Sequence, residues 1–241
     1  MDKRLLAIET GLALALLAAC GAEAPAPQRE QDAAAANDGD APVLAGPPVN
    51  ILAFGDSLFA GYNVAEGESY PAVLEKALRG RGINAMVSNA GVSGDTTQAG
   101  LQRLDFVIDN EAEAPDLAIV ELGGNDLLRG LPPEQTHRNL AAIMAKLEER
   151  GIPVLLMGLR APPNLGADYV SAFDAIYPAL AERHDAELVP FFLEPVYNRP
   201  ELIQPDRVHP TAEGIEVLVA ASLDEVIAAL PEDTRAQPGT D

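Results

Sequence analysis

The sequence contains few residues of the kinds that build disulfides and zinc sites. It has one Cys, three His and no Trp among 241 residues. A single cysteine cannot form an internal disulfide, and this cysteine with three histidines cannot supply the Cys/His spacing of a zinc site. The many carboxylates also show no D-x-[DN]-x-[DN]-G calcium-loop pattern. We therefore predict no structural metal.

Positive charge is also scarce. Sixteen Lys and Arg stand against 37 Asp and Glu, which gives a net charge of −21. Such a chain repels polyphosphate backbones and anionic lipid headgroups, so nucleic acid is excluded as a partner. The length is enough to bury a sizeable core and predicts about one domain.

The N-terminus has the features of an export signal. Lys3 and Arg4 precede the apolar stretch 11–19, which is too short to span a bilayer as a mature helix. The following LAAC ends at Cys20 and resembles a bacterial lipobox, in which the cysteine is diacylated and becomes the first mature residue. The alternative is an ordinary secretory signal in which Cys20 is incidental, and Glu9 departs from either pattern.

The lipobox resemblance predicts a lipoprotein signal peptide over residues 1–20 and membrane attachment through Cys20. It implies a bacterial, membrane-anchored protein that faces the periplasm. Gly21 stands where an inner-membrane retention signal often has Asp, which favours the outer membrane.

The segments next to the two ends are poor in large apolar side chains. Residues 21–48 are rich in Ala, Pro, Gln and acids, and residues 231–241 are polar and contain two Pro. Such compositions cannot bury enough apolar surface to offset the entropy of ordering. We therefore predict a flexible tether at 21–48, one folded domain at 49–230 and a disordered tail at 231–241.

Within the predicted domain, short apolar runs alternate with longer amphipathic ones. The runs typical of strands are 49–55, 84–91, 116–124, 152–159 and 186–192, and those typical of helices are 70–82, 96–110, 134–151, 168–184 and 211–230. This alternation is the pattern of βαβ units. It predicts an α/β fold in three layers, with a five-stranded parallel sheet covered by helices on both faces.

In such sheets the functional site lies outside the carboxyl ends of the strands. The five expected strands are followed in turn by GDSL, AGVSGDT, GGND, LRAPPN and, past the last strand, DRVHP. These loops are therefore expected to meet at one edge of the sheet.

Ser57 in the first of these loops has two interpretations. It is a favoured helix N-cap residue, as is Asp56 before it. At a strand-to-helix turn its hydroxyl can also be exposed as an acyl-transfer nucleophile, which then requires a base. His209 is the one histidine at a strand end, because His137 and His184 fall inside helix patterns. Asp206, three residues before His209, has a spacing that lets its carboxylate reach the imidazole.

Gly91 and Asn125 also have ordinary structural explanations, a turn glycine and a helix cap. The combination is more informative than any single residue. GDSL, NAGVSGDT, GGND and DxxHP occur in this order on consecutive strand ends.

These four blocks resemble those of the SGNH (GDSL) hydrolases over residues 49–222. The further segments VSGDTT, LGGNDLLRG and HPTAEG resemble most the branch of bacterial acyl-CoA thioesterase I, arylesterases and lysophospholipases. The resemblance implies a flavodoxin-like hydrolase fold and no cofactor. A departure is DRVHP, where that branch often has DGIHP.

The resemblance also implies roles for the residues. Ser57, His209 and Asp206 correspond to the catalytic triad, and the oxyanion would be held by Ser57, Gly91 and Asn125. The apolar strand-end loops are candidates for an acyl-binding groove, or equally for loop packing on the core. The candidate substrate-binding residues are Leu58, Leu127, Leu159, Arg160 and Pro162.

The expected activity is hydrolysis of carboxylic esters, with small acyl esters, thioesters or lysophospholipids as substrates. A carbohydrate acetylesterase and an acyltransferase would carry the same motifs. A non-catalytic surface-binding lipoprotein is a further alternative, although such a protein would be expected to have lost a triad or oxyanion residue.

Overall fold

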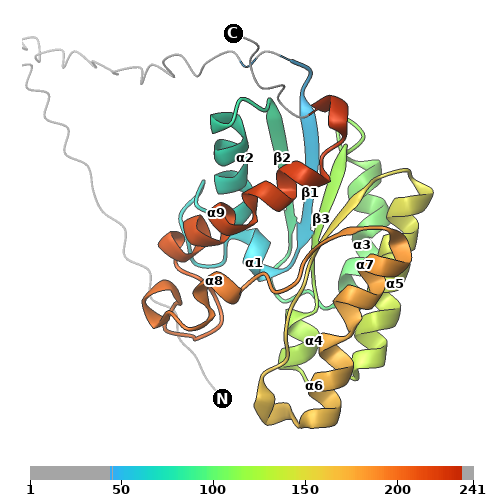
Figure 1. Cartoon of the computed structure of the whole chain (residues 1–241), viewed down its shortest axis with the longest axis vertical. Helices are drawn as coiled ribbons and strands as arrows, with labels where there is room; N and C mark the ends of the chain where they lie inside the picture. Colours follow the sequence, from blue (N-terminus) through green and yellow to red (C-terminus); the bar gives the residue numbers. More distant parts are fainter. Residues whose placement is uncertain (1–43, 45, 235–241) are drawn as a thin grey trace, which may run out of the picture. The chain divides into compact units, whose positions relative to one another are not determined.

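A computed structural model describes residue 44 and residues 46–234, which belong to a compact unit that begins at Pro42 (Figure 1). The predicted signal peptide, Cys20 and most of the predicted tether lie outside the described residues. The predicted tail begins with a short 3-10 helix, Glu232–Thr234, and the rest of it is also outside.

The centre of the fold is a five-stranded sheet in which all paired neighbours are parallel. Its strands are β1 (Val49–Gly55), β2 (Ala85–Gly91), β3 (Leu117–Glu121), β4 (Val154–Met157) and β5 (Glu187–Val189). Their order is β2-β1-β3-β4-β5, the doubly wound order in which a crevice forms beyond the strand ends. The expected α/β fold with a five-stranded parallel sheet is confirmed.

Helices cover both faces of this sheet (Figure 1). The α-helices are α1 (Ser57–Ala60), α2 (Tyr70–Gly80), α3 (Thr97–Asp109), α4 (Gly124–Leu128), α5 (Pro133–Glu149), α6 (Ala167–Asp174), α7 (Ile176–His184), α8 (Glu194–Tyr197) and α9 (Ala212–Ala229). Two further 3-10 turns are Pro163–Leu165 and Pro200–Leu202. Within the described part of the chain, no helix is both long and apolar enough to cross a membrane.

The alternation of side chains along β1 divides the core into two clusters. Ile51 and Ala53 face a cluster formed with α2 and α9, whereas Leu52 and Phe54 face one formed with α3, α5, α6 and α7. Because successive strand residues point to opposite faces, one continuous apolar strand serves both layers.

The helix expected over 168–184 is divided in the structure into α6 and α7, with the break at Ala175. Pro178 explains the division. A proline has no N–H for the bond to the residue four positions earlier, here Asp174, and its ring crowds that carbonyl. The side chain of Asp174 instead accepts the Ala161 N–H at 2.8 Å and so holds the loop after β4.

Candidate active site

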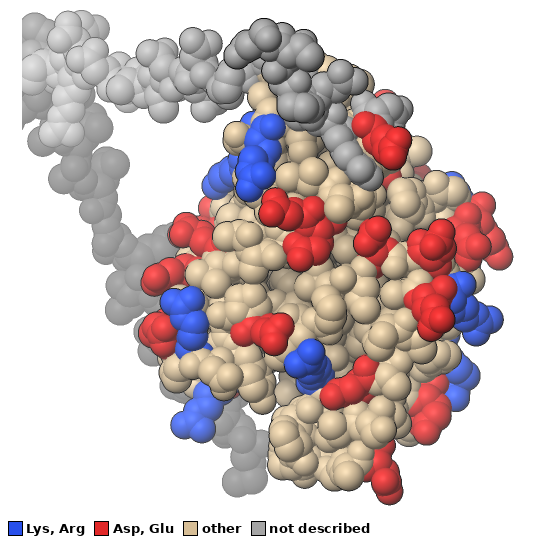
Figure 2. Space-filling model, viewed as in Figure 1, with Lys and Arg blue, Asp and Glu red and all other residues tan. Residues whose placement is uncertain are grey.

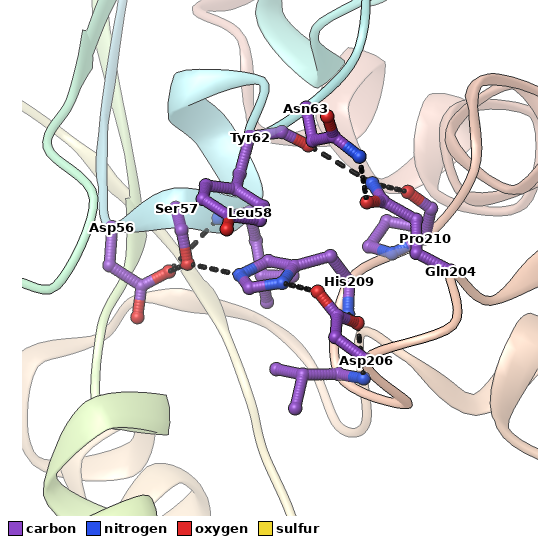
Figure 3. Close-up of polar contacts among 10 residues, drawn as sticks. Asp56, Ser57, Leu58, Tyr62, Asn63, Gln204, Asp206, His209 and Pro210 are labelled. Atoms are coloured by element: carbon purple, nitrogen blue, oxygen red, sulfur yellow. Dashed lines mark hydrogen bonds and ion pairs between the residues drawn. The ribbon is translucent and has the colours of Figure 1, made fainter.

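Three side chains from two distant parts of the chain form a continuous line of hydrogen bonds (Figure 3). His209 Nε2 lies 2.8 Å from Ser57 Oγ, and His209 Nδ1 lies 2.7 Å from Asp206 Oδ2. When the neutral imidazole carries its proton on Nδ1, the ring donates to Asp206 and accepts from the serine hydroxyl. This is the arrangement of a nucleophile, a base and a carboxylate that orients the base.

The turn after β1 presents Ser57 as the first residue of α1. Asp56, and not Ser57, caps this helix, because Asp56 Oδ1 accepts the Leu58 N–H at 3.0 Å. The Ser57 N–H has no acceptor among residues 46–234. The N–H of Ser57 is therefore available to a ligand, while its hydroxyl lies 2.8 Å from His209 Nε2 and 3.5 Å from Asp56 Oδ1. This arrangement favours the nucleophile interpretation over the cap.

Asp206 is held as a carboxylate by the loop around it. Partial burial raises its pKa, but hydrogen bonds from the His209 ring and from the N–H groups of Val208 and His209 outweigh burial and lower the pKa to about 2. Asp206 is thus ionised throughout the neutral range and stabilises a protonated imidazole.

A second set of contacts fixes the loop that carries His209. The buried Gln204 donates to the carbonyls of Tyr62 at 3.0 Å and Pro210 at 2.8 Å, and its Oε1 accepts from Asn63 Nδ2 at 3.0 Å (Figure 3). The Tyr62 ring also packs on the imidazole, with ring centroids 4.3 Å apart. The loop with the base is therefore tied to the loop that follows the nucleophile.

Asn125 lies at the start of α4, beyond the end of β3. One N–H of its amide donates to Asp56 Oδ2 at 2.9 Å, and the residue lines the same cavity as Ser57. The bond to Asp56 fixes the plane of the Asn125 amide. The second N–H of this amide is therefore already oriented before a substrate binds.

Gly91, which was expected to supply an oxyanion donor, is the last residue of β2. Its N–H already donates to Asn89 Oδ1 at 2.9 Å, and a Cβ at this position would lie 2.3 Å from the Ala60 nitrogen. The glycine is therefore explained by the close approach of β2 to α1. Gly94 in the same loop has a φ of +87° and an N–H without an acceptor among the described residues, and its carbonyl accepts from Arg129 at 2.8 Å.

A pair of buried carboxyl groups lies directly behind the nucleophile. Glu121 ends β3 opposite Gly55, is fully buried, and its Oε2 accepts the Asp56 N–H at 3.4 Å. Burial, the charge of Asp56 and a hydrogen bond to Asp56 raise the pKa of Glu121 well above its usual range. Burial also raises the pKa of Asp56, whereas bonds from Leu58, Glu121 and Asn125 lower it. We infer that the pair shares one proton, which resides on Glu121.

Two further contacts hold the strand-end loops together. Arg103 donates to Asp95 Oδ2 at 2.6 Å and to the Gly55 carbonyl at 2.9 Å, and so joins the loops after β2 and β1. The buried Asp126 of the GGND block accepts both the N–H and the hydroxyl of Thr97, at 2.8 and 2.5 Å. The motif residues next to the site residues thus position α3 and α4.

An apolar cavity of about 240 Å³ opens beside Ser57. Four of the five expected substrate-binding residues line it, namely Leu58, Leu127, Leu159 and Arg160. Pro162 is not among the lining residues. Leu128, from the same apolar strand-end loop as Leu127, also lines the cavity. Residues that were not expected from the sequence complete the wall: Phe191, Leu193, Val196, Tyr197, Ile203, Arg207 and Val208.

The structure also separates the three histidines. His137 lies in α5 and His184 at the end of α7, where its Nδ1 contacts Glu148 at 3.1 Å. The expectation that they belong to helix faces is confirmed. In the part of the chain that the structure describes, no group of three or more His, Cys, Asp or Glu is arranged to hold a metal ion.

Comparison with known proteins agrees with this geometry. A family model described as the GDSL-like lipase/acylhydrolase family matches residues 53–217. Over 164 residues, 68% of this chain, the sequence is 43% identical to an arylesterase of Vibrio mimicus and 42% identical to thioesterase 1/protease 1/lysophospholipase L1 of Escherichia coli K12. The alignments cover 81% and 76% of those proteins.

Solved structures give the same result. AlinE4, an SGNH-hydrolase family esterase, is 64% identical with a TM-score of 0.66, over 77% of this chain and 98% of that one. TesA is 38% identical with a TM-score of 0.71, over 75% and 99%. The chain therefore belongs to the GDSL-like lipase/acylhydrolase family, the SGNH hydrolases, and is an ester-hydrolysing enzyme.

Proposed function

We propose that this esterase is a serine hydrolase of acyl esters and thioesters that acts through Ser57, His209 and Asp206. The observation that carries the proposal is the unbroken line of hydrogen bonds from Asp206 to Ser57 beside an apolar cavity. The names of the relatives, an arylesterase and a thioesterase/lysophospholipase, support acyl substrates of this range.

In the proposed reaction, Ser57 Oγ attacks the acyl carbonyl while His209 Nε2 takes its proton. The imidazolium then gives this proton to the leaving alcohol or thiol, and an acyl-serine ester remains. Water, deprotonated by the same imidazole, hydrolyses that ester. Asp206 keeps the Nδ1 proton in place and stabilises the imidazolium in both steps.

The oxyanion requires donors near Ser57. We assign the Ser57 N–H and the free N–H of the Asn125 amide to this role, since Asp56 orients the amide. Gly91 is the third donor that the family resemblance implies, and its N–H would serve when it exchanges its bond to Asn89 for one to the oxyanion. Donors of this kind are worth about 3 to 4 kcal/mol each at the transition state.

The cavity favours acyl chains longer than acetyl. Its volume of about 240 Å³ corresponds to roughly eight water molecules at ~30 Å³ each, so that a two-carbon acetyl group would leave most of it empty. Its walls are mainly Leu, Val, Ile and aromatic side chains. The acetyl group of a carbohydrate acetylesterase substrate would contact only a small part of this apolar wall.

The test is the initial rate on p-nitrophenyl esters from acetyl to palmitoyl and on acyl-CoA thioesters, with Ser57→Ala as control. Activity that requires Ser57 and is highest on a chain longer than acetyl is expected. A maximum at acetyl would support the carbohydrate esterase instead. Faster release of acyl product on addition of an alcohol, with an alkyl ester formed, would identify an acyltransferase.

We also propose that the enzyme is exported and anchored in a bacterial membrane by diacylated Cys20, facing the periplasm. The support is the sequence pattern of residues 1–20 alone, because these lie outside the described residues. Labelling with a radioactive fatty acid in a bacterial host should mark the wild-type protein and fail to mark Cys20→Ala. Equal labelling of the wild-type protein and of Cys20→Ala would contradict this proposal.

A further inference from the structure

Two arginines line the apolar cavity without an acidic partner. Arg160 follows β4, and Arg207 stands between Asp206 and His209. Neither guanidinium forms an ion pair with any described residue. This is notable in a chain with 37 Asp and Glu against 16 Lys and Arg, whose carboxylates are spread over the face shown in Figure 2.

Most other basic side chains of the described region already have partners. Arg103, Lys146 and Arg150 pair with carboxylates. Lys76, Arg79 and Arg129 donate to backbone carbonyls. Arg160 and Arg207 are thus exceptions, and both are exposed at the cavity that contains the nucleophile.

The orientation of Arg160 is fixed by its packing. Its guanidinium carbon lies 5.1 Å from the centre of the Phe191 ring, which packs in turn on Tyr197 with ring centroids 5.4 Å apart. Stacking on an aromatic face uses the plane of the guanidinium and leaves the N–H groups at its edge free. Those donors are suited to bidentate recognition of a carboxylate or phosphate.

Arg207 is held by its backbone instead. Its φ of +62° is rare for a residue with a side chain, and its N–H donates to the Gln204 carbonyl at 2.9 Å. The left-handed conformation costs free energy, and glycine would adopt it without that cost. The arginine side chain at this position therefore needs an explanation other than the turn.

We propose that Arg160 and Arg207 form an anion-binding subsite, and that the enzyme prefers acyl esters that carry a carboxylate or phosphate. This inference rests on the proposed function, since it concerns the substrate of the same site. Water cleaves the ester to an acid and an alcohol, and the anionic group is bound without reacting. The group can belong to the far end of the acyl chain or to the alcohol.

Two matched pairs of substrates separate these sources. Mono-p-nitrophenyl adipate and p-nitrophenyl hexanoate differ by a carboxylate at the end of a six-carbon acyl chain. Hexanoyl glycerol phosphate and hexanoyl glycerol differ by a phosphate on the alcohol. For each pair the measured quantity is the ratio of kcat/KM for the anionic ester to that for the neutral ester.

In Arg160→Gln and Arg207→Gln this ratio should fall at least about threefold each for one or both pairs, and about tenfold or more in the double variant. A fall confined to the adipate pair places the anion on the acyl chain, and one confined to the phosphate pair places it on the alcohol. The matched control is Arg183→Gln, at an exposed arginine near the C-terminal end of α7 that also forms no ion pair with any described residue. Its ratio should stay at the wild-type value.

A second measurement does not depend on the variants. In the wild type, added salt should lower the ratio, because an exposed charge pair is screened while the neutral ester is not affected by screening. Ratios that are the same in wild type and double variant, and independent of salt, would overturn the subsite. A wild-type enzyme that hydrolyses neither neutral ester would instead contradict the proposed function itself.

Discussion

At the scale of single residues, Asn125 is the side chain whose role is most open to a direct test. Its amide donates to Asp56 on one side and faces the cavity on the other. Removing an oxyanion donor typically lowers kcat by about 100- to 1000-fold, since the donor acts mainly on the transition state. Asn125→Ala should therefore lose kcat on this scale, with a much smaller change in KM.

The control is Asn110→Ala, which removes an amide at the end of α3 that donates to the Phe106 carbonyl. It should retain wild-type kcat. A folded Asn125→Ala enzyme with kcat within about threefold of wild type would exclude this amide from the oxyanion site.

The buried pair of Asp56 and Glu121 gives a prediction about stability and pH. Its protonated member, Glu121, has a pKa raised well above 4.5 by burial and by the charge of Asp56. The folded protein therefore keeps a proton that the unfolded chain releases near the usual Glu pKa. Consequently this pair makes the free energy of unfolding decrease as pH rises above about 4.5, by at most about 1.4 kcal/mol per pH unit.

Glu121→Gln keeps a donor for Asp56 and removes the ionisation. Relative to wild type, the variant should gain stability progressively from pH 5 to pH 8 in urea unfolding. The exposed Glu182→Gln in α7 is the control and should follow the wild-type curve. If the wild-type and Glu121→Gln curves are parallel over this range, Glu121 is not the proton carrier.

At the scale of elements, the loop with His209 depends on Gln204. Its buried side chain joins Tyr62, Asn63 and Pro210, and its backbone N–H donates to the His209 carbonyl at 2.8 Å. Gln204→Ala leaves two carbonyls without their donor, which should lower the free energy of unfolding by about 1 to 3 kcal/mol. A less fixed base should also lower kcat by on the order of tenfold.

Asn63→Gly provides a matched comparison. It removes one donor to Gln204 but keeps the left-handed backbone, where φ is +56°. Its losses in urea stability and in kcat should both be smaller. A Gln204→Ala enzyme that is less stable but has wild-type kcat would show that the network supports the fold without positioning His209.

The elements that were predicted best are those whose residue pattern alone specifies the secondary structure. The five strands are mostly apolar runs and the strand ends carry the motifs, so the sheet and the proposed triad residues were predicted together. The division of the 168–184 helix has a local cause too, Pro178, but the amphipathic pattern passes through it without a change. Local periodicity alone therefore overestimated the length of that helix.

Contacts between distant segments could not be predicted from local sequence patterns. Glu121 meets Asp56 only because β1 and β3 pair in one register, and Gln204 reaches Tyr62 across 142 positions of sequence. The bond from the Gly91 N–H to Asn89 is likewise a property of the folded loop. Positions of site residues followed from the sequence, whereas the groups that orient them required the structure.

At the scale of the whole molecule, the two core clusters determine which part of the chain is needed for folding. All their buried members lie between Val49 and Leu230, the limits predicted for the domain. The hydrophobic stabilisation of the fold, about 25 cal/mol per Å² of buried apolar surface, should therefore come mainly from residues 49–230.

We accordingly predict that residues 44–234 fold alone and keep the activity of the chain that begins at Gly21. Thermal unfolding of the two proteins should agree within about 3 °C, because a change of 1 kcal/mol moves the midpoint of a domain of this size by about 2 to 4 °C. The kcat/KM on a soluble p-nitrophenyl ester should agree within about twofold, since the proposed triad and the cavity lie entirely within the retained residues. A midpoint lower by 10 °C or more in the shorter protein would mean that residues 21–43 pack against the domain, and the predicted tether would then be part of the fold.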